Sequence, residues 1–347
     1  MEILYRERLI ELLGRASSLR VGVMGDFTLD GYWFADMTRS RLSREAPLFP
    51  KPVVQETYNL GGAANVAWNL ANARIARVYA FTVLGMDWRA ELLKRLLVEA
   101  RIRLDDILIS KYWLTPFFGK VILTAHDLQQ EDARLDFANS QPLVPDIEAA
   151  LLARLQARLP GLDALIIADY QPVGIFTPQL RAALVQLAGK NPSKIFLADS
   201  REQIGDFASM VIKPNESEAA SLFFPERETG TLTPQELSQA ALQFQVQYGK
   251  PVFITLSERG VICVVNGISG YIPAIKVPPP IDPVGAGDTF LAWLSIGLAA
   301  GASPWEAARL ATLATAVTIR QIRVTGAASP EQILEMYDAI PEECQWE

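Results

Sequence analysis

Short apolar runs alternate along the chain with longer segments that carry helix-start signals. The apolar runs are too short for helices and are typical of strands buried on both faces of a sheet. Strands that alternate with helices predict an α/β fold, with a mostly parallel central sheet flanked by helices on both faces. The predicted strands are Val21–Met24, Val78–Val83, Ala164–Ala168, Lys194–Ala198, Met210–Ile212, Val252–Leu256 and Val261–Val265.

Three of the intervening segments have a clear helix start. Thr233-Pro-Gln-Glu236, Ser303-Pro-Trp-Glu306 and Ser329-Pro-Glu-Gln332 each place a hydroxyl at the N-cap, a proline at the first helical position and an acceptor at the third. The hydroxyl and the acceptor can cap the free amides of a helix reciprocally. We therefore expect a helix to begin directly after each hydroxyl residue.

Two regions break the alternation. From about Met37 to Tyr58, and again from Thr115 to Phe137, the sequence reads as extended segments without a long helix. We predict that they form a small β-sheet that rises from the main sheet as a lid. No Pro/Gly/Ser linker, composition shift or internal repeat divides the chain.

Composition and charge disfavour several classes of protein. The 347 residues include 32 Lys and Arg against 39 Asp and Glu, a net charge of −7, so nucleic-acid binding is disfavoured. Half of the residues are hydrophobic, which is enough for a large core. Charges interrupt the N-terminus, and the longest apolar run, Phe290–Ala302, is too short for a membrane span. We expect a cytoplasmic protein with no membrane partner.

Histidine and cysteine are too rare for two common kinds of chemistry. Cys263, Cys344 and His126 cannot assemble a Cys/His zinc site, and His126 alone is available for a Ser-His-Asp or Cys-His pair. His126 lies in the predicted lid beside Asp127, and we interpret it as a loop residue. Catalysis should therefore depend on carboxylates, hydroxyls, backbone amides and basic groups.

The segment Ile281-Asp-Pro-Val-Gly-Ala-Gly-Asp-Thr-Phe290 combines two chemical features. Gly285 and Gly287 remove side chains from a turn whose amides converge at the positive N-terminus of a helix, which makes an anion site. Asp288 would stand at the same point, where a carboxylate is useful if it takes a proton from an attacking hydroxyl. Phosphoryl transfer to an alcohol needs that pairing. On these residues alone, an aspartate N-cap after a glycine turn is an equally good interpretation.

Two other nucleotide-binding motifs are missing. The chain has no G-x-x-x-x-G-K-[ST] P-loop, and Gly22-Val-Met-Gly-Asp26 stands where a dinucleotide-binding protein would have G-x-G-x-x-G. A P-loop enzyme and a nucleotide-dependent oxidoreductase are therefore disfavoured.

Two motifs together resemble the ribokinase, or pfkB, family of sugar kinases. They are Gly61-Gly-Ala-Ala-Asn-Val-Ala67 and Asp282-Pro-Val-Gly-Ala-Gly-Asp-Thr-Phe290, and the resemblance extends from Val21 to about Leu334. It implies a ribokinase-like α/β fold with a β-sheet lid over the sugar. It also implies ATP and Mg²⁺ as cofactors, leaves a monovalent-cation requirement open, and implies transfer of the γ-phosphoryl group to a sugar hydroxyl.

The resemblance also bears on domain organisation. Because the two motifs must meet at one active site, we predict a single kinase domain over residues 1–347, with a lid from about 37–58 and 115–137. Exposed lid strands have unpaired edges, so we expect a homodimer joined through the lids.

The resemblance assigns the centre of the site. It implies that Asp288 is the general base and that the amides of Gly285, Ala286 and Gly287 form the anion hole. Asp30, in the segment after the first strand, matches the family aspartate that binds sugar hydroxyls. An aspartate in a strand-end turn is the alternative for Asp30.

Gly61, Gly62 and Asn65 are further sugar-binding candidates. The glycines would let the backbone approach the sugar at a helix start, with Asn65 one turn in. The alternative is a glycine loop that caps the helix Ala63–Ala73, with Asn65 making a local bond.

Asn215 and Glu218 match the family N-x-x-E motif, which the resemblance implies helps to organise magnesium, largely through water. The same spacing is a capping box. Both interpretations can hold together, because a cap would fix Glu218 at a helix start that faces the nucleotide.

Three residues are nucleotide-binding candidates besides the glycine turn. Ser257 and Gly260 match the family segment that borders the ATP base and phosphates, and Thr312 falls near the expected adenine pocket. Thr312 stands where the family usually has asparagine, and Val284 replaces a common threonine, changes that bear on nucleotide or cation preference.

Four strings make the chain most similar to the heptose 7-phosphate kinases within the family. They are Gly25-Asp-Phe-Thr-Leu-Asp-Gly-Tyr-Trp33, Ser43-Arg-Glu-Ala-Pro47, Arg134-Leu-Asp-Phe137 and Ala168-Asp-Tyr170. This similarity makes Arg134, Asp136 and Asp169 candidate substrate contacts.

Basic residues in the lid agree with a phosphorylated substrate, because arginine forks match phosphate oxygens. A solvated charged flap is the alternative. The residues are Arg39, Arg41, Arg44, Lys120 and Arg134. One departure concerns the same contact: Gln171-Pro-Val-Gly174 stands where heptose kinases usually carry lysine followed by glycine.

The sequence therefore predicts an ATP-dependent sugar kinase, with D-glycero-D-manno-heptose 7-phosphate 1-kinase as the leading activity. A ribokinase-type kinase for another sugar, sugar phosphate or nucleoside is the first alternative. A catalytically inactive nucleotide- or sugar-binding protein is the alternative from another class.

Overall fold

A sheet of eight strands forms the centre of the part of the chain that this computed structural model describes, residues 2–227, 232–322 and 324–340. From one edge to the other, its strands are β14 (Ile268–Pro273), β13 (Gly260–Val265), β12 (Val252–Thr255), β11 (Val211–Ile212), β10 (Ile195–Ser200), β9 (Ala164–Asp169), β1 (Arg20–Gly25) and β4 (Arg77–Phe81). Neighbours from β4 to β12 are parallel, and β12, β13 and β14 pair antiparallel. The mostly parallel sheet is confirmed.

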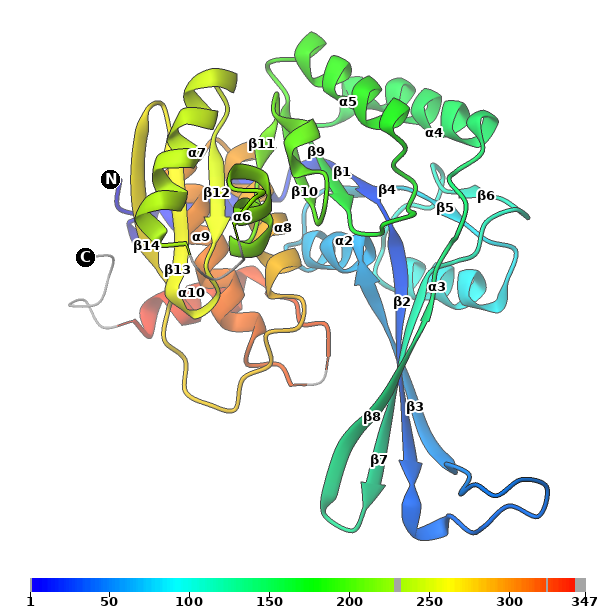
Figure 1. Ribbon diagram of the computed structural model, residues 1–347. Helices are drawn as coiled ribbons and strands as arrows, with labels where there is room; N and C mark the ends of the chain where they lie inside the picture. The colour runs from blue at the N-terminus through cyan, green and yellow to red at the C-terminus, as the bar shows by residue number, and fades with distance from the viewer. Residues whose placement is uncertain (1, 228–231, 323, 341–347) are drawn as a thin grey trace.

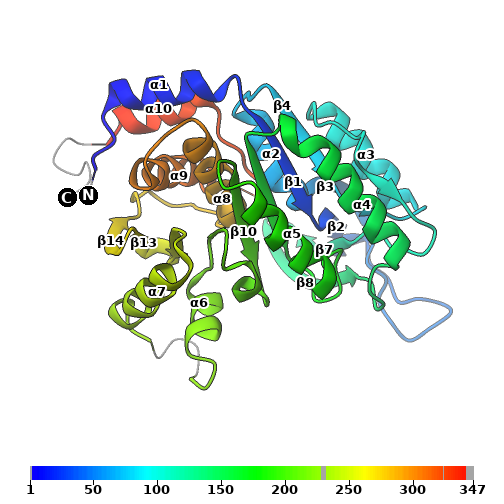
Figure 2. The same cartoon turned by 90° about the horizontal axis from the view of Figure 1, so that it is seen from above.

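Helices cover both faces of this sheet, as predicted (Figure 2). One core includes α1 (Arg6–Ala16), α2 (Ala63–Asn72), α3 (Trp88–Glu99), α8 (Ala286–Ala299), α9 (Pro304–Thr318) and α10 (Pro330–Asp338). The other includes α4 (Pro145–Arg158), α5 (Pro178–Lys190), α6 (Glu216–Phe223) and α7 (Pro234–Tyr248). Successive strand residues point to opposite faces, so Ile166 packs in the first core while Leu165 and Ile167 pack in the second.

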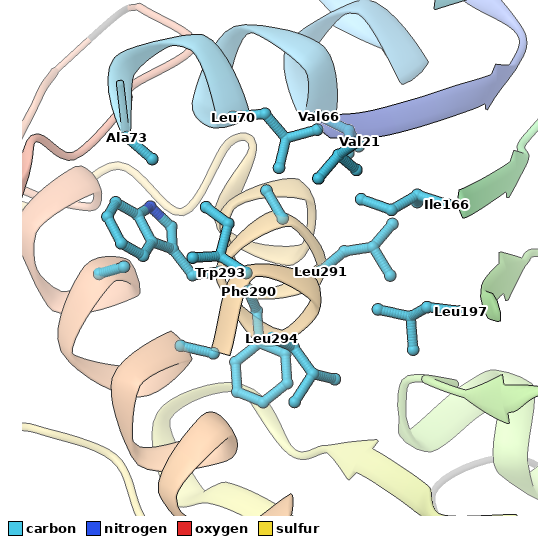
Figure 3. Packing of buried hydrophobic residues seen from close by; sticks show 14 of the residues in the cluster. Val21, Val66, Leu70, Ala73, Ile166, Leu197, Phe290, Leu291, Trp293 and Leu294 are labelled. Carbon is cyan, nitrogen blue, oxygen red and sulfur yellow. The ribbon is translucent and has the colours of Figure 1, made fainter. Parts of the chain in front are cut away.

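Helix α8 is buried along most of its length. Leu291 lies toward Ile166 and Leu197 of the sheet, and Trp293 lies on the side of Ala73 (Figure 3). A helix that is apolar on all sides is typical of a core element. Its burial fixes the position of its N-terminus beside the carboxyl ends of the strands.

A second sheet extends away from the main body (Figure 1). Its strands, in order, are β3 (Val53–Gly62), β2 (Phe27–Asp36), β7 (Phe117–Ala125) and β8 (Leu128–Phe137). The sheet therefore includes 27–36, which precede the segments from which we predicted a lid. Residues 40–52 form a loop rather than a strand, because Pro47, Pro50 and Pro52 remove backbone donors.

All three predicted helix starts are confirmed. Thr233, Ser303 and Ser329 each form a reciprocal capping box with the residue three positions later. The start of α6 at Asn215 has the same arrangement.

The remaining elements are short. They are β5 (Val83–Leu84), which pairs with β6 (Leu108–Ile109), and the 3₁₀ turns η1 (Met37–Arg39), η2 (Leu159–Gly161), η3 (Ile204–Phe207) and η4 (Ser257–Arg259). Among the described residues, no helix is long and apolar enough to cross a membrane. Cys344, named above, lies outside the described residues.

Candidate active site

A cavity of about 1070 Å³ lies at the carboxyl ends of the central strands, next to the second sheet. In open α/β sheets, ligands bind at this edge. Asp30, Lys120 and Arg134 of the second sheet line one part of the cavity, and Ser257 and Gly260 line another.

The start of α8 contributes a glycine turn and a carboxylate to this cavity. Gly285 is the N-cap residue in the left-handed region, with φ of 78°, and Asp288 is the third residue of the helix. Asp288 is therefore not the N-cap, which was the alternative interpretation of the motif. The amide of Ala286 donates to Pro283 O at 3.1 Å. Within the described chain, no hydrogen bond from the amides of Gly287 or Asp288 is found, and both residues line the cavity, so these amides are available to a ligand as donors.

The carboxylate of Asp288 has two hydrogen-bond donors. Asn65 Nδ2 lies 2.8 Å from Oδ2, and the Tyr170 hydroxyl lies 3.0 Å from Oδ1. Burial raises the pKa of Asp288 to about 6, and nearby Asp199 contributes in the same direction, whereas Asn65, Tyr170 and Lys213 lower it. A carboxylate with this pKa is mostly ionised at neutral pH and accepts a proton more readily than an ordinary aspartate.

Three residues beside Asp288 were not among the site residues predicted from the sequence. The Tyr170 hydroxyl also lies 3.0 Å from Asp199 Oδ2, and Lys213 Nζ lies 3.0 Å from the same Asp199 oxygen. Tyr170, Asp199 and Lys213 are all buried. Tyr170 belongs to a string quoted above, and a search for polar residues at every strand end would have found Asp199 and Lys213 as well.

Asp30 lies on β2 and lines the same cavity as Asp288. Burial raises the pKa of Asp30 to about 6, and the charge of Asp288 adds to this rise. Gly61 on the neighbouring strand does not line the cavity; a Cβ there would overlap the Asp30 carboxylate. Gly62, with φ of 53°, is the N-cap of α2 and lines the cavity.

The predicted lid cations divide into two groups. Lys120 and Arg134 line the cavity, whereas Arg39, Arg41 and Arg44 are exposed and do not. Lys120 Nζ is 3.1 Å from Glu131, and Arg134 Nε is 2.6 Å from Asp136. Asp136 thus holds Arg134 and is not a lining residue. His126 lies in the turn between β7 and β8, in agreement with its interpretation as a loop residue.

Asp169 lies away from the main cavity. Its carboxylate is 2.9 Å from Arg181 Nε and 3.0 Å from Ser200 Oγ, and it lines a separate cavity of about 260 Å³. Gln171 and Tyr170 line both cavities. The structure does not bring Asp169 together with Asp30 and Asp288.

The nucleotide-binding candidates all line the main cavity. Ser257 begins the short turn η4 and Gly260 follows it; Gly260 has a φ of 111°, where a Cβ would overlap Ile272 O. Thr312 on α9 donates its hydroxyl to Ala308 O at 2.9 Å. Lys276 lines the cavity too and was not among the candidates.

Asn215 and Glu218 cap the start of α6 and also line the cavity. The Asn215 amide donates to Glu218 Oε2 at 2.7 Å, and the Glu218 amide donates to Asn215 Oδ1 at 2.9 Å. Burial, together with Asp199, raises the pKa of Glu218 to about 7. Both interpretations of the motif therefore remain, because the cap leaves one carboxylate oxygen of Glu218 without a bond to Asn215.

The family described as "pfkB family carbohydrate kinase" matches residues 50–332, so the chain belongs to this family. It is 30% identical to bifunctional protein HldE of Trichlorobacter lovleyi over 332 residues, 95% of this chain and 65% of that protein. It is 29% identical to bifunctional protein HldE of Campylobacter jejuni over 304 residues, 87% of this chain and 61% of that protein. The chain thus spans about three-fifths of the length of these curated relatives.

Solved structures confirm the ribokinase-like fold. The ribokinase of Arabidopsis thaliana complexed with ribose and ATP has a TM-score of 0.69, with 18% identity over 92% of this chain and 98% of that one. Phosphofructokinase-2 of Escherichia coli, in complex with substrates and products, has the same TM-score, identity and coverage.

Proposed function

We propose that this chain transfers the γ-phosphoryl group of ATP to a sugar hydroxyl, with Asp288 as general base. One observation carries the proposal. Asp288 stands in the first turn of a helix whose free amides face the same cavity as Asp30. A base, an anion-binding turn and a sugar-binding carboxylate are thereby available to one acceptor hydroxyl.

The arrangement supports a simple sequence of events. Asp30 binds hydroxyls of the acceptor and holds the reacting one toward Asp288, which takes its proton as the oxygen attacks phosphorus. The amides at the start of α8 stabilise the charge on the transferred group. Proton transfer to a positioned base contributes roughly 10²–10⁴-fold to such reactions. The second sheet, which carries Asp30, would limit the access of water.

The nucleotide would occupy the part of the cavity lined by Ser257, Gly260 and Thr312. The relative from Arabidopsis thaliana with ribose and ATP supports this choice of donor. Magnesium fits the donor set beside it, because Asn215 and Glu218 offer oxygen ligands, and burial together with nearby Asp199 raises the pKa of the Glu218 carboxyl, so that a cation there would be favoured. When bound, the ion would neutralise charge on the phosphates.

For the acceptor, we propose D-glycero-D-manno-heptose 7-phosphate, phosphorylated at O1. The strings that resemble heptose 7-phosphate kinases support it, as do Lys120 and Arg134, which offer two cations at the acceptor side of the cavity. A different acceptor is the second candidate. It is favoured by the acidic partner that each of these cations has, and by the neutral Gln171, which lines the cavity where heptose kinases carry lysine.

We also propose a homodimer joined through the second sheet. The loop and strand start at its far end expose apolar side chains to solvent, namely Leu42, Leu48, Phe49, Val53 and Val54. Sedimentation of the purified protein tests this assembly. A monomer at all micromolar concentrations would contradict it.

The decisive experiment measures ADP release with a panel of sugars and sugar phosphates that includes heptose 7-phosphate. Wild-type protein should turn over at least one acceptor, and Asp288→Asn should nearly abolish turnover while ATP still binds. Wild-type turnover in the variant would refute the role of Asp288. Background release with every acceptor would instead favour an inactive binding protein.

A further inference from the structure

The hydroxyl of Tyr170 lies between two carboxylates. Its oxygen is 3.0 Å from Asp288 Oδ1 and 3.0 Å from Asp199 Oδ2. A phenol has one proton to donate, so it cannot serve both carboxylates at once while both are ionised. Burial and the two carboxylates raise the pKa of Tyr170 well above its ordinary value, so the proton stays on the phenol.

The two carboxylates differ in their other partners. The Asp199 oxygen that faces Tyr170 also lies 3.0 Å from Lys213 Nζ, so the charge of Asp199 is compensated without Tyr170. Asp288 accepts from the neutral amide of Asn65, and no cation within ion-pair distance of it is found among the described residues. While Asp288 is ionised, a hydrogen bond from Tyr170 therefore stabilises Asp288 more than it stabilises Asp199.

We propose that Tyr170 is a positioning residue that donates to Asp288 while this base is ionised and turns to Asp199 once the base is protonated. The inference rests on the proposed function of Asp288. In the step, the O–H bond of the acceptor breaks and an O–H bond forms on Asp288. The acceptor oxygen bonds to the γ-phosphorus of ATP as the bond from that phosphorus to the bridging oxygen breaks and ADP leaves, and Tyr170 keeps its own proton throughout. Asp199, paired with Lys213, is the acceptor for the released phenol.

The charges that face Asp288 agree with this role. Asp30 on β2 and Asp199 on β10 are like charges, and Lys213 after β11 is the opposite charge. Hydrogen bonds to an ionised carboxylate favour the ionised form, and Tyr170 donates one of the two that lower the pKa of Asp288. Removing this donor should make Asp288 harder to ionise.

The test compares the pH dependence of kcat in Tyr170→Phe and wild type. A hydrogen bond to a charged group corresponds to about one pKa unit or slightly more. The acidic limb should therefore move up by about one unit from the pKa of about 6, so that turnover at pH 6 falls about fivefold while turnover at pH 9 stays within about threefold of wild type. Tyr337→Phe is the matched control, because it removes a buried phenol that donates to Leu4 O at 3.0 Å in a remote helix. Its acidic limb should not move.

A second variant should shift the acidic limb in the opposite direction. Asp199→Asn removes a negative charge near Asp288 and replaces the alternative acceptor for Tyr170 by a neutral amide, so the acidic limb should move to lower pH. Carbon-13 NMR titration of aspartate carboxyl signals, with Asp288 identified through Asp288→Asn, measures the same shifts without turnover. Wild-type inactivity on all acceptors would therefore defeat the proposed function, whereas the role of Tyr170 is judged separately from the titration.

Three results would overturn the inference about Tyr170. One is an unchanged titration of Asp288 in Tyr170→Phe, and another is an equal loss of turnover at every pH, which would indicate a structural role alone. The third is a shift of the Asp288 titration to higher pH in Asp199→Asn. If Tyr170→Phe does not fold, the direction in which the Asp288 titration shifts in Asp199→Asn decides whether the inference stands.

Discussion

Replacing Gly285 by alanine should disturb both the start of α8 and the base. Gly285 has a φ of 78°, and a Cβ built there would lie 2.6 Å from Asn65 Nδ2. That nitrogen donates to Asp288 Oδ2 at 2.8 Å. The substitution therefore strains the backbone and pushes Asn65 away from the carboxylate it holds. Gly287 is the matched control, because a Cβ there meets nothing within 4 Å and its φ is not positive.

The expected loss of stability follows from the backbone conformation of residue 285 and from the displaced hydrogen bond. The left-handed conformation costs a residue with a Cβ about 1–2 kcal/mol, and a lost hydrogen bond to a charged group costs about 1.5–3 kcal/mol. At about 2.1 cal/mol/K of unfolding entropy per residue, 1 kcal/mol corresponds to about 1.4 °C for a chain of 347 residues. Gly285→Ala should lower the unfolding temperature by about 3–7 °C. Gly287→Ala should leave it unchanged or raise it by about 1 °C, because alanine favours the helix.

Differential scanning calorimetry and steady-state kinetics check this pair. Gly285→Ala should also lower kcat, because Asp288 loses the donor that orients it. An unfolding temperature within about 1 °C of wild type together with unchanged kcat would refute the reasoning. A larger destabilisation in Gly287→Ala than in Gly285→Ala would refute it as well.

Three further predictions concern the carboxylates and cations of the cavity. Gly61→Ala should displace the Asp30 carboxylate and raise the KM for the acceptor at least about tenfold while the KM for ATP stays constant; equal rises in both values in steady-state kinetics would contradict it. Arg134→Met keeps an apolar stem over the Phe118 ring but removes the guanidinium, so kcat/KM should fall about 10–100-fold for a phosphorylated acceptor and much less for a neutral sugar. The pKa of Asp288, about 6 in the folded chain against an ordinary 3.8, makes the folded state bind more protons than the unfolded state, so stability falls as pH rises through this window. Asp288→Asn should therefore unfold at a higher temperature than wild type at pH 8, by up to about 4 °C, with a smaller difference at pH 5; calorimetry that finds the larger difference at pH 5 would disprove this.

Local signals predicted the helix starts and most central strands. A capping box involves residues three positions apart, so Thr233, Ser303 and Ser329 carry their own evidence. The second sheet was harder to predict. Strand β2 follows β1 after a single residue, and nothing in the local pattern marks that the chain leaves one sheet for the other between Gly25 and Phe27.

The partners of the base could not be predicted in the same way. Tyr170 and Asp199 meet because β9 and β10 are neighbours, and this order depends on packing between residues far apart in sequence. Side-chain direction was a second obstacle. Asp169 ends β9 and points toward Arg181 of α5, whereas the next residue, Tyr170, points toward Asp288. The sequence places both residues at the strand end but does not say which one faces the cavity.

The first turns of α8 combine an unfavourable group with the residues that compensate for it. Ionised Asp288, with its raised pKa, costs up to about 3 kcal/mol at pH 8. Leu291 and Trp293, a few residues later, are fully buried, and burial of one such side chain contributes about 1.5–3 kcal/mol. Two of them therefore offset the carboxylate, and they also fix the helix that aims it. This explains physically why the glycine-aspartate motif leads directly into the longest apolar run of the chain.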